Sequence, residues 1–237
     1  MNDLLCKNSK NLYVEKEDRD VTTEHFAAKY GFYKLFWIFF IGSFLGVVIE
    51  VLFCFATTGH YESRVGLVYL PLNLLYGFGT LFMSLGLHWA RNKSNWIIFL
   101  GGFIIGSIYE YFCSWIQQTI FGSVSWQYDY LPLNLNGRIN VIFSCFWGIL
   151  AILWVKLLEP LMCHWIAKIP NKIGKPLTWI LIVIIAIDAA ISIAAVWRWG
   201  DRLLNLPASN SIEYYLDEHF PNERLEKIYP NMDFIDL

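Results

Sequence analysis

Residues 42–50 read Gly42-Ser-Phe-Leu-Gly46-Val-Val-Ile-Glu50, and sixty positions later the chain reads Gly102-Phe-Ile-Ile-Gly106-Ser-Ile-Tyr-Glu110. A second pair of matching stretches follows at nearly the same offset, Leu70-Pro-Leu-Asn-Leu74 and Leu131-Pro-Leu-Asn-Leu135. Two matches at nearly one offset indicate an internal duplication.

The spacing of the two glycines and the glutamate predicts a helix seam that carries a buried acid. Each step of four residues along an α-helix advances about 40° past a full turn, so the three positions share one stripe. Glycine allows a second helix to approach closely, and that approach hides the carboxylate from lipid. We therefore expect Glu50 and Glu110 at matched positions and at similar depth.

The composition is that of a membrane protein. Of the 237 residues, 56% are hydrophobic and only 16% are charged, whereas soluble domains carry about 25% charged residues. The chain has no basic cluster interleaved with aromatic residues, so nucleic-acid binding is not expected. The five cysteines have no CxxC spacing, and those in apolar runs are expected to be small buried hydrophobic residues.

Apolar stretches predict an all-α fold, a polytopic transmembrane helical bundle of about five spans. Two parallel repeats, each a two-span hairpin, would cover about 34–90 and 96–158, within a transmembrane domain at 34–198. The expected spans are about 34–57, 67–90, 96–120, 139–158 and 176–197.

The distribution of Lys and Arg predicts the orientation in the plasma membrane. Basic residues gather in the polar tail 1–33, in the connection 91–95 and in the connection Glu159–Lys175. These segments, and with them the N-terminus, are expected on the cytoplasmic side. The tail 1–33 lacks the apolar core of a cleaved signal peptide. The acidic tail 199–237, with one short amphipathic helix near Ile212–Phe220, is expected on the exoplasmic side.

The candidate site consists of polar side chains expected at similar depth on the exoplasmic side. Glu50 follows Lys34 by sixteen residues, or about 24 Å of helix. An intramembrane carboxylate costs about 2.5–3.5 kcal/mol on insertion scales, so each glutamate requires a compensating partner. The predicted substrate-binding residues are Glu50, Arg64, Glu110, Arg138, Asn134, Asn136 and Asp188, the last with Ser192 four residues further on.

Two interpretations of these residues stay open at this point. In the first, Glu50 and Glu110 pair with Arg64 and Arg138 and only stabilise the bundle, and Asp188 makes one hydrogen bond between helices. In the second, the cluster lines a hydrated cavity that holds a substrate or ion. The Pro and Asn of the repeated Leu-Pro-Leu-Asn-Leu favour the second, because irregular backbone at membrane depth is tolerated mainly beside protein or water.

Other kinds of site find no support in the sequence. His60, His88 and His164 are isolated from one another and from any Cys or acid at ligand spacing, so no metal is expected. The serines lack the context of a nucleophile elbow, and no G-x-x-x-x-G-K-[ST] stretch is present. We therefore expect no catalytic residue and no cofactor.

At these residues the chain resembles the ABC-transporter type IV (CmpB-type) family of membrane proteins. The likeness covers about residues 35–195, and one departure is Gln127, where the family usually has Asp. It is carried by Gly46-Val-Val-Ile-Glu50, Arg64-Val-Gly66, Tyr76-Gly-Phe-Gly79, Gly106-Ser-Ile-Tyr-Glu110, Phe121-Gly122, Trp126-Gln-Tyr128, Asn134-Leu-Asn-Gly-Arg-Ile139, Trp147-Gly148 and the Asp188/Ser192 pair.

The resemblance implies a permease or permease subunit rather than an enzyme. The depth of the glutamates and arginines described above then predicts a polar substrate or ion site in the exoplasmic half of the bilayer. The partners of such a permease would be the lipid bilayer and a separate ATPase. No EAA-type coupling motif is evident. The connection 91–95 is too short to dock an ATPase, so only Glu159–Lys175 could do so. Oligomerisation is left open.

Two alternatives to a permease remain. One is a membrane enzyme at the outer leaflet, whose arginines hold an anionic lipid headgroup while a glutamate acts as general base. The other is a non-catalytic assembly or stress-sensing protein in which the polar cluster is structural. Association with a separate ATPase would favour the permease over both.

Overall fold

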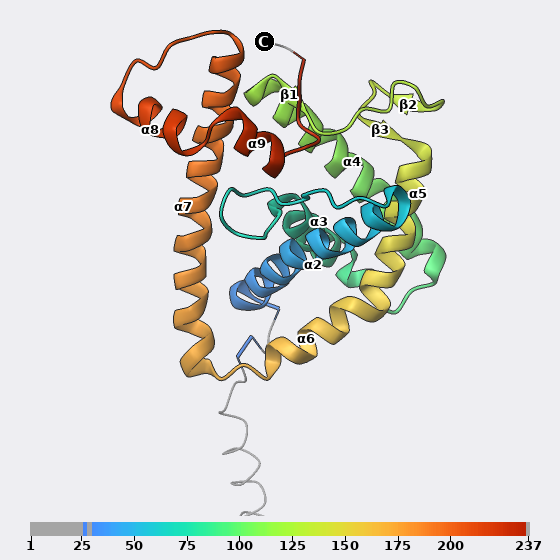
Figure 1. The fold of residues 1–237 in the computed structure, drawn as a ribbon. Helices are drawn as coiled ribbons and strands as arrows, with labels where there is room; N and C mark the ends of the chain where they lie inside the picture. The colour runs from blue at the N-terminus through green and yellow to red at the C-terminus, as the bar shows by residue number, and fades with distance from the viewer. Residues whose placement is uncertain (1–25, 28–29, 236–237) are drawn as a thin grey trace, which may run out of the picture.

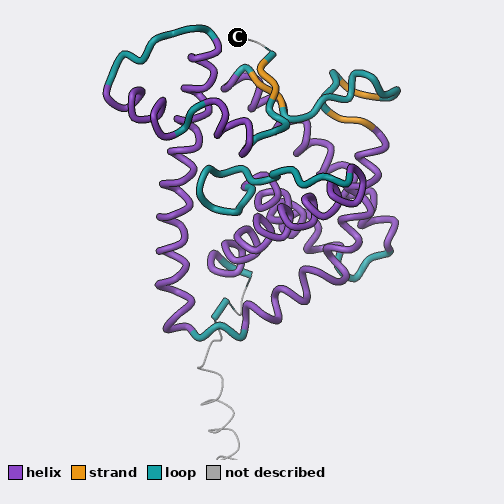
Figure 2. The backbone as a smooth tube through the Cα atoms, in the orientation of Figure 1, coloured by secondary structure: helices purple, strands orange, loops and turns teal. Residues whose placement is uncertain are grey.

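The computed structural model describes residues 26–27 and 30–235, and these residues are mainly helical (Figures 1 and 2). Most of the expected tail 1–33 lies outside the described residues. Among these described residues, four helical runs are long and apolar enough to cross a membrane. They are α2 (Phe32–Thr58), α4 (Asn95–Phe121), the run Val141–Ala167 and α7 (Asn171–Leu203).

The run Val141–Ala167 contains a π-helical turn where the sequence predicted its end. It consists of α5 (Val141–Leu153), η2 (Trp154–Leu158) and α6 (Glu159–Ala167), and α6 leaves α5 at an angle (Figure 1). The backbone N–H of Glu159 bonds to the carbonyl of Trp154, five residues earlier, which accommodates Pro160 and its missing N–H.

Most of the expected connection Glu159–Lys175 is therefore helical, as α6 and the start of α7. Only residues 168–170 separate α6 from α7. Pro176, expected at the start of the fifth span, lies inside α7, which is 33 residues long and begins five residues earlier.

The second expected span, 67–90, is helical only from Leu74. Helix α3 (Leu74–Leu87) has 14 residues and is followed by a short 3-10 turn, η1 (His88–Ala90). At 1.5 Å per residue, α3 falls short of the roughly 30 Å hydrocarbon layer. It begins at Asn73, whose side-chain oxygen accepts a hydrogen bond from the Leu75 N–H at 3.0 Å. A fifth span stays a prediction.

Two pairs of helices, α2 with α3 and α4 with α5, pack through the glycine stripes. A Cβ atom added to Gly46 would lie 2.3 Å from Cβ of Tyr76, and one added to Gly106 would lie 2.3 Å from Cγ of Trp147. One turn earlier, Gly42 and Gly102 meet Thr80 and Ala151 equally closely. The glycines therefore lie at close helix contacts, as the sequence predicted.

Helix α7 lies beside both pairs, and the chain after it folds back over one end of the bundle (Figure 1). This end also holds β2 (Asn134–Leu135) and β3 (Ile139–Asn140), which form an antiparallel hairpin between α4 and α5. The opposite end contains the largest hydrophobic core, where Trp37 Nε1 donates a hydrogen bond to Thr178 Oγ1 at 3.0 Å and joins α2 to α7.

The C-terminal tail is folded. It contains α8 (Ser211–His219), α9 (Asn222–Ile228) and β4 (Asp233–Phe234), and β4 pairs antiparallel with β1 (Ser123–Val124) after α4. The helix expected near Ile212–Phe220 is α8. Its residues and those of α9 pack against the end of α7 in a second core that includes Trp199, Leu216, Phe220 and Leu225.

Candidate functional site

A cavity of about 470 Å³ lies where the two helix pairs, α7 and the C-terminal tail meet. Glu50 and Arg64 line it from the first pair and its loop, Glu110 and Trp147 line it from the second pair, and residues 228–232 of the tail form another wall. Its volume falls within the range of small-molecule sites, about 300–1,000 Å³. Residues far apart in the sequence thus line one partly open cavity.

Glu50 and Arg64 form an ion pair, as the first of the two interpretations of the sequence expected. Arg64 Nε lies 3.6 Å from Glu50 Oε1, while Arg64 Nη2 is 2.8 Å from a carboxylate oxygen of Glu62. The same Nη2 atom contacts Cys54 Sγ at 3.3 Å. The Arg64 side chain is 15% exposed and that of Glu50 is 32% exposed, so the glutamate remains accessible to a molecule in the cavity.

Glu110 is buried, with 8% exposure, and both of its oxygens accept hydrogen bonds. Tyr128 OH donates to Oε1 at 2.8 Å, and Trp147 Nε1 donates to Oε2 at 2.9 Å. Burial and the nearby Glu110 carboxylate raise the pKa of Tyr128, so the hydroxyl keeps the proton that it donates. Within residues 26–27 and 30–235, no cationic side chain forms an ion pair with Glu110.

Arg138 does not pair with Glu110, contrary to the first interpretation of the sequence. Its guanidinium donates to Ser114 Oγ at 3.0 Å and to Gln118 Oε1, and it lies 5.8 Å from the ring centroid of Tyr111. Ser114 and Gln118 are one and two turns beyond Glu110 on α4. Arg138 follows β2 in the hairpin, and the hairpin places it beside the end of the helix instead of beside the carboxylate.

Asn134 and Asn136 shape the hairpin and do not line the cavity. Asn134 Oδ1 accepts from the Gly137 N–H at 3.0 Å, and its Nδ2 donates to the Leu131 carbonyl at 2.7 Å. Asn136 has a φ of 52° and donates to Tyr111 OH at 2.9 Å. Asn73, the corresponding residue of the first Leu-Pro-Leu-Asn-Leu, does line the cavity, as does Asn231 of the tail.

Asp188 and Ser192 bind the backbone of the irregular segment before α3. Asp188 carboxylate oxygens accept from the N–H groups of Leu70 at 2.7 Å and Tyr69 at 3.3 Å, and Ser192 Oγ accepts from the Val68 N–H at 2.9 Å. These donors have no helical partner, and buried backbone N–H groups require one. Asp188 therefore stabilises the loop, while Ser192 also lines the cavity.

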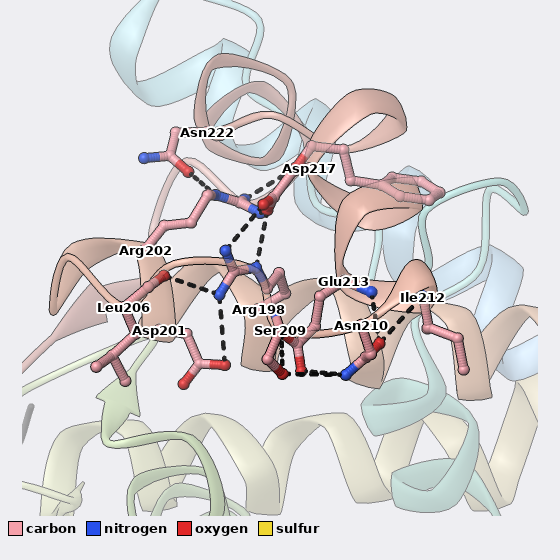
Figure 3. A network of polar contacts seen from close by, with 11 residues as sticks. Arg198, Asp201, Arg202, Leu206, Ser209, Asn210, Ile212, Glu213, Asp217 and Asn222 are labelled. Atoms are coloured by element: carbon pink, nitrogen blue, oxygen red, sulfur yellow. Dashed lines mark hydrogen bonds and ion pairs between the residues drawn. The ribbon is translucent and has the colours of Figure 1, made fainter.

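A polar cluster of Arg198, Arg202 and Asp217, which we call the clasp, attaches the C-terminal tail to α7 (Figure 3). Arg198 Nε and Nη2 donate to the two oxygens of Asp217 at 2.9 and 2.8 Å, and Arg202 Nη1 donates to Asp217 at 2.7 Å. Beyond this clasp, Tyr229 OH contacts the Gly66 carbonyl at 3.4 Å. The clasp and this contact hold residues 228–232 against the cavity.

A family profile described as "Putative ABC-transporter type IV" matches residues 37–193. The chain belongs to this family. Its membership and the four apolar helices identify a membrane protein. No curated protein and no solved structure gives a match to the chain.

The family match contains Glu50, Arg64 and Glu110 but ends inside α7, so the tail that closes the cavity lies outside it. Sequence reasoning missed this wall, because the tail is acidic and aromatic without a clear pattern. It also did not include Tyr128, which is 9% exposed, among the predicted site residues. The Trp147-Gly148 pair, part of the resemblance, was the available signal for Trp147.

Proposed function

We propose that this chain is a small permease, or a permease subunit, of an ABC-type transporter, with its substrate site in the cavity. The observation that carries the proposal is the convergence of Glu50, Arg64 and Glu110 from separate elements on one space of substrate size. Ionisable groups inside a membrane bundle generally mark a pathway or binding site. Membership of the family described as "Putative ABC-transporter type IV" supports a role in transport.

We also propose that Asp188, Asn134, Asn136 and Arg138 act indirectly, because their side chains hold the loops at this end of the bundle. The matched glycine contacts of Gly46 and Gly106 support a duplication of two hairpins that insert in the same direction.

The proposed orientation places the cavity in the exoplasmic half of the plasma membrane, with the N-terminus cytoplasmic and the tail 199–237 outside. Cysteine labelling in whole cells tests it. Cysteines introduced at Lys93 and Lys172 should react with a membrane-impermeant thiol reagent only after permeabilisation. Cysteines introduced at Glu62 and Ser125 should react with it in intact cells. The reverse pattern at either pair would overturn the orientation.

An ATPase partner would dock at the cytoplasmic end of the bundle. Lys156 Nζ donates to the backbone carbonyls of Arg91 and Lys93 at 2.9 and 3.1 Å, and so joins the α3–α4 connection to the π turn. Exposed Lys168 and Lys172 lie nearby in the sequence, around the turn from α6 to α7. We therefore propose that the ATPase contacts the α3–α4 connection and the turn from α6 to α7 together, instead of a single connection over Glu159–Lys175.

The test of the function is a cellular one. In a strain lacking this protein, solute accumulation should be compared after expression of wild type, Glu110→Gln and Glu226→Gln. Glu110→Gln keeps the shape of the side chain but removes its charge, so it should fold and fail to restore accumulation. Glu226 is exposed on α9 and serves as the matched charge control. Full restoration by Glu110→Gln would contradict a site at Glu110.

A further inference from the structure

We propose that the cavity binds an organic cation, a quaternary ammonium or protonated amine, with Glu110 as its counter-charge and aromatic side chains as its walls. The biological role of such a ligand rests on the proposed permease function, whereas its chemical class follows from the cavity. The charge balance, the hydrogen bonds of Glu110 and the lining side chains each support this class.

The charge balance of the cavity is negative. Among the described residues that line it, Arg64 is the one cationic side chain. That guanidinium already contacts two carboxylates, Glu62 at 2.8 Å and Glu50 at 3.6 Å. Glu110, by contrast, has no cationic partner in the described part of the chain. A cationic ligand would supply the missing charge.

The hydrogen bonds of Glu110 orient its carboxylate without neutralising it. Tyr128 OH and Trp147 Nε1 are neutral donors, one to each oxygen. Both donors also line the cavity, so they fix the carboxylate at its wall. A carboxylate with 8% exposure is costly in a low-dielectric interior unless an opposite charge compensates it.

The remaining wall is rich in aromatic side chains. Aromatic rings attract cations through their negative faces, Trp most strongly, and quaternary ammonium groups are commonly recognised by several rings together. Such a group cannot donate hydrogen bonds, so it depends on rings and a nearby carboxylate. The aromatic residues that line the cavity are Tyr76, Phe121, Trp126, Tyr128, Trp147 and Tyr229.

Two other ligand classes fit less well. An anion would need a cationic group whose charge is not already balanced. The Arg64 guanidinium faces the carboxylates of Glu50 and Glu62, although its Nε atom has no hydrogen-bond partner within the described ranges. A divalent metal would need several oxygen or nitrogen ligands around one point. In the part of the chain that the structure describes, no three His, Cys, Asp or Glu side chains gather in that way.

The test is ligand binding to the purified full chain in detergent, measured by calorimetry. Choline and tetraethylammonium are the cationic probes, neohexyl alcohol is the uncharged carbon analogue of choline, and inorganic phosphate is the anionic probe. A cationic probe should bind, and choline should bind about tenfold or more tightly than neohexyl alcohol. Equal binding of choline and its neutral analogue, binding of phosphate alone, or no binding of either cation would overturn the proposal.

Variants then test whether Glu110 supplies the negative charge that binds the cation. Glu110→Gln should weaken cation binding about tenfold or more, while Glu226→Gln on the exposed face of α9 should leave it unchanged. Thermal unfolding is measured first. If Glu110→Gln does not fold, Glu50→Gln, whose side chain is partly exposed, replaces it and should weaken binding in the same direction. Unchanged binding in a folded Glu110→Gln protein would overturn the assignment.

The binding measurements and the accumulation measurements test the ligand class and the permease function separately. Cation binding without any effect of the protein on solute accumulation would keep the ligand class and contradict the permease. Accumulation of a neutral or anionic solute that depends on Glu110 would keep the permease and contradict the ligand class.

Discussion

Gly106 of α4 lies directly against Trp147 of α5. A Cβ atom at this glycine would stand 2.3 Å from Trp147 Cγ, closer than any real side chain approaches. The same approach brings Trp147 Nε1 to 2.9 Å from Glu110 Oε2, one turn further along α4. The glycine stripe is therefore both the packing surface of the helix pair and the reason that the indole reaches the carboxylate.

Replacing Gly106 should disturb packing and site together. Gly106→Ala should lower stability by about 1–3 kcal/mol, because the rigid indole must move to admit a methyl group, and Gly106→Leu should lower it further. We expect a lower unfolding temperature in detergent for both variants.

Gly79→Ala on α3 is the matched control. Its Cβ would meet Tyr109 at 3.4 Å, an ordinary contact, and alanine is favoured over glycine inside a helix by up to about 1 kcal/mol. Its unfolding temperature should equal or exceed that of wild type. If the unfolding temperature fell equally in Gly106→Ala and Gly79→Ala, the close contact between Gly106 and Trp147 would not determine stability.

Asp188→Ala should loosen the segment that leads into α3. The change leaves the N–H groups of Tyr69 and Leu70 without their acceptor, and a buried donor without a partner costs about 1–3 kcal/mol. Hydrogen exchange should become faster at these two amides, and the unfolding temperature should fall. Asp188→Asn keeps one oxygen in place and should recover part of the loss.

Ser192 provides an internal comparison for this prediction. Ser192→Ala removes the acceptor of the Val68 N–H alone, so its effect on exchange should centre on Val68. If Asp188→Ala leaves exchange at Leu70 unchanged, the carboxylate does not hold the loop.

Asp217→Asn should release the C-terminal tail from α7. Asp217 accepts hydrogen bonds from both Arg198 and Arg202, and charge-assisted bonds of this kind contribute about 1–2 kcal/mol at partly exposed positions. Because residues 228–232 form a wall of the cavity, a cysteine at Asn231 should react faster with a soluble thiol reagent in this variant. A cysteine at exposed Glu226 should react equally in both backgrounds.

The clasp should also weaken at acid pH. The hydrogen bonds from Arg198, and then those from Arg202, lower the pKa of Asp217 below the ordinary value of about 3.9. A lowered pKa in the folded state contributes stability above the unfolded pKa and loses it as pH falls through the folded pKa. The difference in unfolding temperature between wild type and Asp217→Asn should be complete at neutral pH and shrink below about pH 4. A constant difference would contradict the ion pair.

The sequence predicted those parts of the fold that depend on local pattern. The glycine stripes, three of the four long helices and the helix α8 follow from spacing and hydrophobicity. The pairing of Glu50 with Arg64 was one of two interpretations left open, because each half of the repeat supplied one acid and one arginine at similar depth, and this pair is present. The same reasoning failed for Glu110 and Arg138, because the second loop contains an extra hairpin that carries Arg138 past the carboxylate.

Other parts of the site depend on contacts that no local pattern specifies. Trp147 reaches Glu110 only because α4 and α5 pack at Gly106. The tail reaches the cavity only because Asp217 binds α7 and β4 pairs with β1. Both are long-range contacts between segments whose own sequences do not reveal a partner.

Double-mutant cycles should separate the two acid–arginine pairs that the repeat suggested. Arg64 Nε lies 3.6 Å from Glu50, so Glu50→Gln and Arg64→Gln remove the same interaction and their effects should not add. The coupling energy should be about 0.5–1 kcal/mol, as for a partly exposed ion pair.

For Glu110→Gln and Arg138→Gln the effects on the free energy of unfolding should add to within about 0.5 kcal/mol. Each residue has its own partners, since Glu110 accepts from Tyr128 and Trp147 while Arg138 donates to Ser114 and Gln118. The four single and two double variants would be compared by denaturant unfolding under one condition. Strong coupling between Glu110 and Arg138 would mean that the two charges interact directly, and the cavity would then lack the uncompensated carboxylate on which cation binding depends.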